Sequence, residues 1–587
     1  MIILSGIFRS IKSKLNKLMT LERFILLFAD WLTLTGWRRN IFSFFVGAVS
    51  TLALAPFHIM PVLFLTLPIL VFWANPDSGK GPYAINKGET DLNFFIKPTF
   101  SWKQASCGFS IGWWFGFGFH LAGLYWIGNA FMVQKELFAW LIPIAITLMP
   151  ASLAIFYGLA IALLACISGS AVARVLVLVL TFSATEWFRG NVLTGFPWNT
   201  LGYALAHPLI FLQTASVLGI YGMTAITVCV CSAPLPVFLE AIQRKQKAKS
   251  IRPILVLTII PLIIMAVYGV YSLTQTPVNV ANDVRLRIVQ PSIKQRDKFD
   301  PSKRAEILTR HLELSSFGLE QASQEGKGIT HIIWPEAALA FLALRSNEVL
   351  MSIATTLPDE ITLIAGTIRV IYENTVKRNH DKVFNSAMIV DGGGNFIATY
   401  DKVHLVPFGE YLPLQNLLEA IGLEQLTRLK GGFTSGSRHQ PPPRIPGIPD
   451  ARILICYEII FPDYTNFGSK RPSVLINLTN DSWYGLSTGP FQHFHQSIVR
   501  AVEQGVPLIR AGNNGISAVV DGHGRIISKL NLNDVGVVDA SLPKPIKPTI
   551  YSYFGDITFA VFWFSLLFLL YACLRLSDAR KQRKTNL

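Results

Sequence analysis

Long apolar runs are the feature that most constrains how this chain can fold. A helix needs about 20 mostly apolar residues to cross the hydrocarbon core of a bilayer. Runs of this kind lie near 40–56, 57–75, 109–131, 139–167, 172–188, 208–238, 254–272 and 555–574. The first two meet at Pro56 with few residues to spare, so a re-entrant pair remains an alternative there. We therefore predict a polytopic α-helical membrane domain with about eight spans.

The basic residues indicate how these spans are oriented. The net charge is +16, and Lys and Arg gather at 9–39, 244–252 and 575–584, each beside an apolar run. Such clusters are typical of cytoplasmic loops, whereas a nucleic-acid-binding surface would not follow the spans. With eight spans the three clusters share one side, so we expect both termini in the cytoplasm and 280–545 outside. The alternative is that these charges are solvated and carry no topological meaning.

The region between Ala281 and Pro543 has a different residue pattern from the apolar runs. Short β-branched runs alternate there with Gly, Asn, Asp and Pro turns and with amphipathic helical stretches, which is typical of an α/β sandwich. The sequence thus divides into an interfacial or cytoplasmic segment 1–39, a membrane domain 40–275 with seven transmembrane helices, an extramembrane α/β domain 280–545, a closing helix 553–575 and a basic tail 576–587.

Three predicted strand ends in this domain carry reactive side chains. Glu336 follows the run 330–334, Lys402 and Glu410 lie in the segment 400–413, and Cys456 ends the run 452–456 two residues before Glu458. The ends of strands in an open α/β sheet are where sites are usually built. Taken singly, each has an ordinary explanation, because a lone Glu is commonly a helix-terminal charge and a lone Cys is commonly a core residue.

Together, Glu336, Lys402 and Cys456 resemble the catalytic triad of the nitrilase superfamily, in the same chain order. The resemblance implies an α-β-β-α sandwich in which Cys456 is the nucleophile. Glu336 would accept the thiol proton, and Lys402 would stabilise the oxyanion that forms when the thiolate adds to a carbonyl. Glu410 would orient the lysine or assist with protons.

The other five cysteines lie in or beside apolar runs, and Cys456 alone lies in the polar region. No disulfide framework can be built from that distribution, and Cys229 and Cys231 have the wrong spacing for zinc. We expect neither a metal nor a cofactor.

A nitrilase-like domain attached to many spans resembles the apolipoprotein N-acyltransferase family, the membrane-embedded branch of the superfamily. The matching segments run nearly end to end and include 196–199 with Gly202, 456–458, 480–485, 489–493 and 513–515. The resemblance implies a multi-pass protein of the bacterial inner membrane, with its catalytic domain in the periplasm, acting as a monomer. It also implies a ping-pong reaction in which Cys456 takes an acyl chain from a phospholipid as a thioester. The α-amine of a diacylglyceryl-modified N-terminal cysteine of an apolipoprotein would then accept that chain.

We expect the substrates to contact an apolar lining, and Tyr457 and Glu458 to shape the wall behind the thiol. The residues proposed for the lining are Trp198, Phe299, Trp334, Trp483 and Tyr484. For each of them the alternative is core packing or an interfacial belt. The chain departs from the family in two places: Phe299 stands where a Trp is common, and the insertion around 75–106 is long.

Two competing functions remain at this stage. A membrane-tethered amidase or nitrilase would use the same triad with water as the acceptor, although one anchor would suffice for it. A transporter with an external binding domain is the non-enzymatic alternative, but few ionisable residues lie deep in the predicted spans, Glu186 and Arg189 being near one end.

Overall fold

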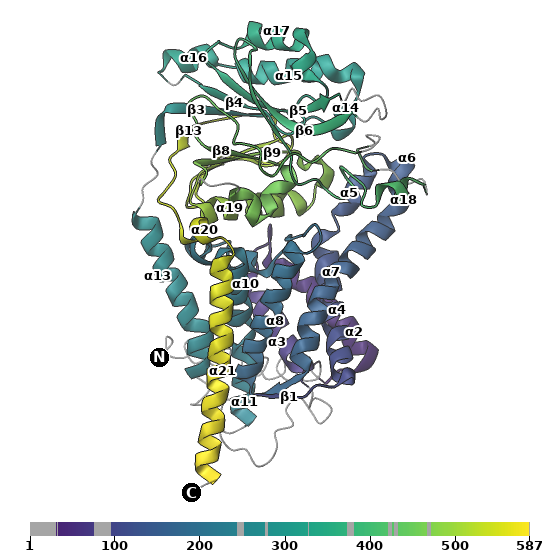
Figure 1. The fold of residues 1–587 in the computed structure, drawn as a ribbon, viewed down its shortest axis with the longest axis vertical. Coiled ribbons are helices and arrows are strands. Elements are labelled where there is room, and N and C mark those ends of the chain that lie inside the picture. Colours follow the sequence, from purple (N-terminus) through teal and green to yellow (C-terminus); the bar gives the residue numbers. More distant parts are fainter. Residues whose placement is uncertain are drawn as a thin grey trace, which may run out of the picture.

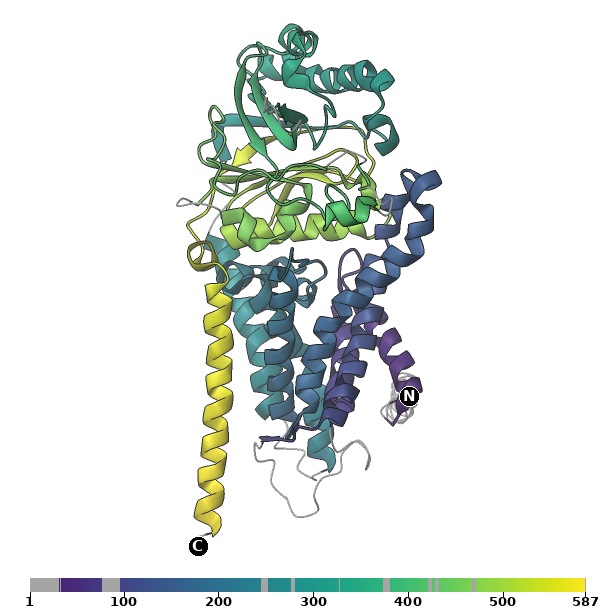
Figure 2. The same cartoon turned by 45° about the vertical axis from the view of Figure 1, so that its right-hand side comes forward.

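The computed structural model describes residues 33–75, 96–243, 252–275, 280–326, 328–372, 381–420, 425–427, 432–466 and 471–585, together with Trp31. A bundle of helices forms one half of the molecule, and a layered α/β domain lies on one end of that bundle (Figures 1 and 2). Most of the predicted segment 1–39, most of the insertion 75–106 and the basic cluster at 244–251 lie outside the described residues.

Within the described part of the chain, eight principal helices make up the bundle. They are α2 (Gly36–Ser50), α3 (Leu63–Trp73), α4 (Trp102–Leu124), α7 (Ile142–Ala165), α8 (Ala171–Asn191), α10 (Ala215–Ser232), α13 (Ile260–Gln275) and α21 (Ile557–Thr585). Among the described residues, five helical stretches are long and apolar enough to cross a membrane: 135–165, 171–191, 215–240, 252–274 and 557–575. Helix α2 has 15 residues and α3 has 11. The five long stretches indicate a membrane protein. Because α2 and α3 are shorter, the count of eight spans remains a prediction.

Small residues let the first helices of the bundle pack closely. A Cβ added at Gly47 of α2 would lie 1.9 Å from the carbonyl oxygen of Phe115, and one added at Gly118 of α4 would lie 1.9 Å from that of Phe44. Backbone contact of this kind is how helices associate where no hydrophobic effect drives them together.

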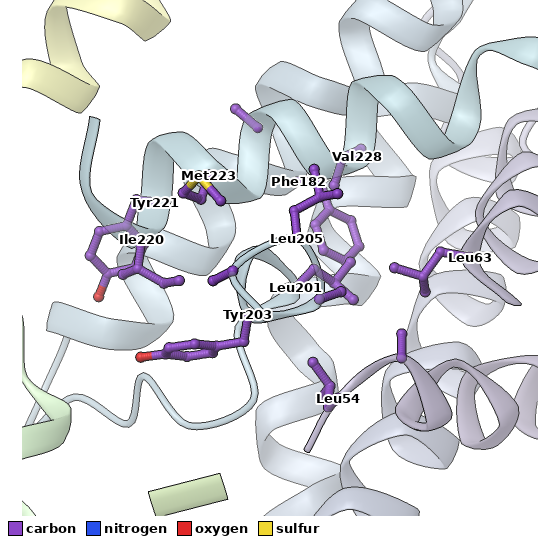
Figure 3. Close-up of a cluster of buried hydrophobic side chains, with 14 of the residues drawn as sticks. Leu54, Leu63, Phe182, Leu201, Tyr203, Leu205, Ile220, Tyr221, Met223 and Val228 are labelled. Atoms are coloured by element: carbon purple, nitrogen blue, oxygen red, sulfur yellow. The ribbon is translucent and has the colours of Figure 1, made fainter. Parts of the chain in front are cut away.

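The interior of the bundle is filled from an irregular segment as well as from helices. Leu201, Tyr203 and Leu205 follow α8, and Figure 3 shows them in one apolar cluster with Phe182 of that helix and Met223 of α10. All five side chains are buried. The segment 196–202, which carries part of the resemblance to the family, is therefore anchored in the membrane domain.

The α/β domain contains two sheets. One has the strand order β13-β3-β4-β5-β6-β7 and the other β12-β11-β10-β9-β8. The strands are β3 (Val280–Gln290), β4 (His331–Ile333), β5 (Thr362–Ile371), β6 (Lys382–Asp391), β7 (Phe396–Asp401), β8 (Ala451–Ile455), β9 (Val474–Thr479), β10 (Leu508–Gly512), β11 (Ser517–Val520), β12 (Ile526–Leu530) and β13 (Gly536–Pro543). The β-branched runs of the sequence predict strands at 284–290, 330–334, 362–369, 385–391, 452–456, 474–478, 508–512, 517–521 and 537–539. These coincide with all the strands except β7 and β12, which carry few fully buried residues.

The two sheets stack face to face between helical layers, as expected for an α-β-β-α sandwich. In β8, Ile453 and Ile455 face the core between the sheets, whereas Leu454 faces helix α19 (Gly489–Gln504). This alternation follows from the period of two residues in a strand. The sheet that contains β3 to β7 and β13, called the outer sheet, is covered by α15 (Arg304–Ser316) and α17 (Asn347–Thr356). The sheet that contains β8 to β12 is called the inner sheet.

Helix α19 lies between the inner sheet and the end of the bundle (Figures 1 and 2). Its Ile498, Val499 and Val502 belong to the same apolar core as the bundle helices. The α/β domain and the helical bundle are therefore joined through a shared core.

Candidate functional site

Cys456 lies where β8 ends and a short 3-10 helix, η8 (Cys456–Ile460), begins. Its φ of 50° is unusual for a residue other than glycine, and such backbone strain concentrates at functional sites. The thiol is buried, and its Sγ lies 4.0 Å from the hydroxyl of Tyr484. The carbonyl of Cys456 lies 3.2 Å from Nε2 of His493, so the turn is held from α19.

Glu336, Lys402 and Glu410 converge beside this turn. Lys402 follows β7, and its Nζ lies 2.9 Å from Oε2 of Glu410 and 3.6 Å from Oε1 of Glu336. All three side chains are buried. Oε2 of Glu336 has no hydrogen-bond partner within the described part of the chain. The glutamate therefore keeps one carboxylate oxygen available to accept a proton.

Asn385 of β6 links the two carboxylates. Its Nδ2 donates to Glu336 and to Glu410, at 2.9 Å in each case. Sequence reasoning missed this residue, because an Asn near the start of an otherwise apolar strand carries no signal of its own. Its two hydrogen bonds fix both glutamates around the Lys402 ammonium group.

Burial and charge set the protonation states of this cluster. Burial alone would lower the pKa of Lys402, but Glu410 and Glu336 outweigh it and hold that pKa above its ordinary value. Burial raises the pKa of the Cys456 thiol to about 12, with Glu336 adding to the rise and Lys402 opposing it. The Lys402 charge favours the thiolate, but it does not offset the effect of burial. The resting site instead holds a neutral thiol, because desolvation is the larger effect, and it therefore needs a base.

Glu458 ties the cysteine turn to the lysine segment. Its carboxylate accepts hydrogen bonds from the backbone N–H of Ile455 and Val403, both at 2.7 Å, and from that of His404 at 3.0 Å. Burial raises its pKa to about 7, and these backbone donors oppose the rise. Glu458 thus positions Lys402 relative to Cys456, which is a more specific arrangement than the wall behind the thiol that the sequence suggested.

An aromatic group from both domains surrounds Tyr484. The ring of Tyr484 lies 4.6 Å from that of Trp126 and 5.6 Å from that of Trp198. The two indole N–H groups donate to the same amide oxygen of Gln492, at 3.2 Å and 2.8 Å respectively. Tyr484 therefore lies beside the nucleophile, and Trp198 packs against Tyr484. Trp126 was not singled out in the sequence, and Gln492 belongs to the segment 489–493, which had no role assigned to it.

A buried ion pair holds the segment that carries Trp198. Arg189 pairs with Glu186 on α8 and donates to the carbonyls of Phe196 and Trp198, the latter at 2.9 Å. These two charges are therefore structural supports of the segment beside the site. Tyr457 reaches the same segment, because its hydroxyl donates to the carbonyl of Gly195 at 3.3 Å.

The remaining predicted lining residues divide into two groups. Phe299 and Trp483 line a cavity next to the aromatic group. Trp334 is fully buried in the core under the outer helices, and its indole N–H donates to Ser315 at 2.8 Å. The structure does not bring Trp334 to the site, because successive residues at the end of β4 point to opposite faces and this one faces α15.

A buried polar group supports the turn from beneath. Asp481 lies 2.9 Å from Nδ1 of His493 and 2.8 Å from the guanidinium of Arg510. Burial would raise the pKa of Asp481, but Arg510 and His493 lower it to about 2. These residues are positioning groups, since the contact with the cysteine is through its backbone carbonyl. The segments 480–485 and 489–493 had marked this region in the sequence, although without roles for Asp481 or Arg510.

Comparisons with known proteins agree with this arrangement. Residues 46–233 match the model of the apolipoprotein N-acyltransferase N-terminal domain, and residues 285–551 match that of the carbon-nitrogen hydrolases. An apolipoprotein N-acyltransferase of Rhodopseudomonas palustris is 41% identical over 90% of this chain and 93% of its own. That of Bradyrhizobium diazoefficiens is 40% identical over 90% and 93%, and that of Agrobacterium fabrum is 36% identical over 93% and 98%. The chain therefore belongs to the apolipoprotein N-acyltransferase family.

Proposed function

We propose that this enzyme, a membrane-bound acyltransferase of lipoprotein biosynthesis, transfers an acyl chain from a phospholipid to the N-terminal amine of an apolipoprotein through a thioester on Cys456. The observation that carries the proposal is the position of Cys456. It is a buried thiol beside the Glu336–Lys402 pair, in a domain that shares its apolar core with the membrane bundle. Lipid substrates can reach such a site from the bilayer.

In the first step the thiol of Cys456 attacks the ester carbonyl of a phospholipid. Glu336 takes the thiol proton on its unpartnered Oε2 as the S–C bond forms. Lys402 stabilises the negative charge on the former carbonyl oxygen, a role typically worth about 3 kcal/mol or more. When the intermediate collapses, the ester C–O bond breaks and the leaving alcohol oxygen receives the proton from Glu336. The products are a lysophospholipid and a thioester.

In the second step the free α-amine of the diacylglyceryl-modified cysteine attacks the thioester carbonyl. Glu336 accepts a proton from the amine as the C–N bond forms, and Lys402 again stabilises the oxyanion. The C–S bond then breaks, and the departing sulfur recovers a proton from Glu336. Both substrates use one nucleophile in turn, so the reaction is ping-pong, and no water enters the balance.

The location follows from the substrates and from the charges along the chain. We place the protein in the bacterial inner membrane with its catalytic domain in the periplasm and both termini in the cytoplasm. The basic clusters at 9–39, 244–252 and 575–584 support this orientation. The domain boundaries 40–275, 280–545 and 553–575 follow the same division.

Thioester formation tests the proposal directly. Purified protein incubated with phospholipid vesicles alone is expected to gain the mass of one acyl chain on Cys456 and to release a lysophospholipid. The Cys456→Ser variant loses the thioester, whereas the matched control Cys573→Ser, which changes an exposed cysteine of α21, retains it. If no acyl adduct forms and small amides are hydrolysed instead, the chain is a membrane-tethered amidase and the transferase proposal is wrong.

A further inference from the structure

A cavity of about 550 Å³ lies next to the proposed nucleophile but does not include it. Its lining includes Gln134, Gln295, Arg296, Phe299, Thr427 and Trp483. Trp483 directly precedes Tyr484, whose hydroxyl is 4.0 Å from the Cys456 sulfur. The cavity is therefore close enough to the site to hold a part of a substrate that does not react.

A chain of amides fixes the orientation of Gln295. The backbone N–H of Ile293 must donate, and it does so to Oδ1 of Asn513 at 3.1 Å, so Nδ2 of Asn513 is the donor to Oδ1 of Asn480. Nδ2 of Asn480 then donates to Oε1 of Gln295 at 2.6 Å. The amide nitrogen of Gln295 is left as a donor without a partner among the described residues, and the residue is 8% exposed.

Two further polar groups of the cavity also lack partners. Oε1 of Gln134 and the hydroxyl of Thr427 are buried, and neither makes a hydrogen bond within the described ranges. Leaving a buried polar group without a partner destabilises the fold, and a ligand that supplies the missing partner removes that cost. A primary amide and a hydroxyl both donate and accept, whichever way the amide is turned.

This set of groups fits a peptide backbone better than a lipid phosphate. A phosphate accepts hydrogen bonds only, and it is usually bound by several cations. Arg296 is the one cation that the described residues contribute to the lining; it lies 3.4 Å from Asp297, and its side chain is 73% exposed. A peptide offers N–H and C=O groups in alternation, which match neutral groups that both donate and accept.

The position of the cavity favours the same ligand. Gln134 follows α5 (Ile127–Met132), which rises from the bundle alongside the α/β domain (Figures 1 and 2). Gln295 and Thr427 belong to that domain. The cavity thus lies beside the catalytic domain, at the end of a candidate span that begins at Lys135. The polypeptide part of a lipid-anchored substrate would extend there.

We propose that this cavity binds the backbone of the first residues after the acylated cysteine of the apolipoprotein. The assignment rests on the proposed function, since it concerns the acceptor of that reaction. Phe299 and Trp483 contact the apolar side chains of the peptide, and Gln134, Gln295 and Thr427 bond to its backbone. Acceptors that carry several residues after the cysteine therefore bind more tightly than the diacylglyceryl cysteine amide alone.

The test compares two acceptors in the full-length protein with phospholipid as donor. One is diacylglyceryl cysteine amide, and the other carries four further residues. The double variant Gln134→Leu/Thr427→Val is expected to raise KM for the long acceptor about tenfold, as two lost neutral hydrogen bonds predict. KM for the short acceptor stays within a factor of two. The control Gln324→Leu/Thr355→Val makes the same changes at exposed positions of α16 (Leu319–Gln324) and α17, and it leaves both KM values unchanged.

Each other outcome overturns the inference in a recognisable way. Equal KM values for the two acceptors in the unmodified protein would show that the cavity contributes nothing to acceptor binding. Slower thioester formation in the double variant would assign the cavity to the phospholipid headgroup. If the unmodified protein forms no thioester and acylates neither acceptor, the proposed function itself fails. The single variant Thr427→Val, which keeps the shape of the side chain, serves as the test if the double variant does not fold.

Discussion

Replacing Glu336 with Gln removes the proposed base and leaves the rest of the site in place. Glutamine keeps the oxygen that Asn385 reaches at 2.9 Å, so the packing of the cluster survives. The Cys456 thiol then loses its proton acceptor. With a pKa of about 12, only roughly one thiol in 3×10⁴ is ionised at pH 7.5. Removing the negative charge of Glu336 also lowers that pKa in part, because this charge helps to raise it. We expect thioester formation to slow about 10³- to 10⁴-fold.

The measurement is single-turnover thioester formation on phospholipid vesicles, followed by intact mass from pH 6.5 to 9.5. In the variant the rate should rise about tenfold per pH unit, because the thiolate fraction does so below the pKa of the thiol. The unmodified protein should show no such slope above neutral pH. The control Glu348→Gln changes an exposed carboxylate on α17 and should behave as the unmodified protein does. A loss smaller than tenfold, or parallel pH profiles, would refute the role of Glu336 as base.

Three other substitutions test separate parts of the arrangement. Glu410→Gln removes the closer partner of a buried lysine and should lower the thermal inactivation temperature, consistent with a cost of about 3–5 kcal/mol; an unchanged temperature would contradict the ion pair. Trp334→Phe should leave KM for both substrates unchanged while costing about 1 kcal/mol of stability through the lost bond to Ser315, and a raised KM would restore its assignment to the lining. Trp198→Phe removes the indole N–H that bonds to Gln492 and should slow acyl transfer while the fold persists, as judged by thermal melting; undiminished transfer would exclude Trp198 from the site.

The reactive residues could be recognised from the sequence because chemistry restricts their types. A thiol nucleophile needs a base and an oxyanion stabiliser, and the order of Glu336, Lys402 and Cys456 at strand ends resembled a known superfamily. The structure brings Lys402 within ion-pair distance of both glutamates and places all three reactive residues in one buried cluster. Their catalytic roles stay predictions until the variants are measured.

The supporting residues could not be found in this way. Asn385 bridges two glutamates, and Glu458 accepts from the backbone of both Ile455 and Val403. Such contacts depend on how two sheets are stacked, which no local pattern specifies. The sequence also could not show that Trp334 lies outside the site. An aromatic residue near a strand end can face either the site or the outer helices.

The sequence by itself determined that this chain enters a membrane and that it carries a cysteine, a glutamate and a lysine suited to acyl transfer. Apolar length and side-chain chemistry are local properties, so they can be read along the chain. Only the tertiary structure decided that α19 joins the two domains through one core and that the thiol is neutral at rest. It also decided that polar groups without a partner among the described residues line one cavity with Gln295. Burial, pKa shifts and unmet hydrogen bonds arise from residues far apart in the chain, and they exist only once those residues are packed together.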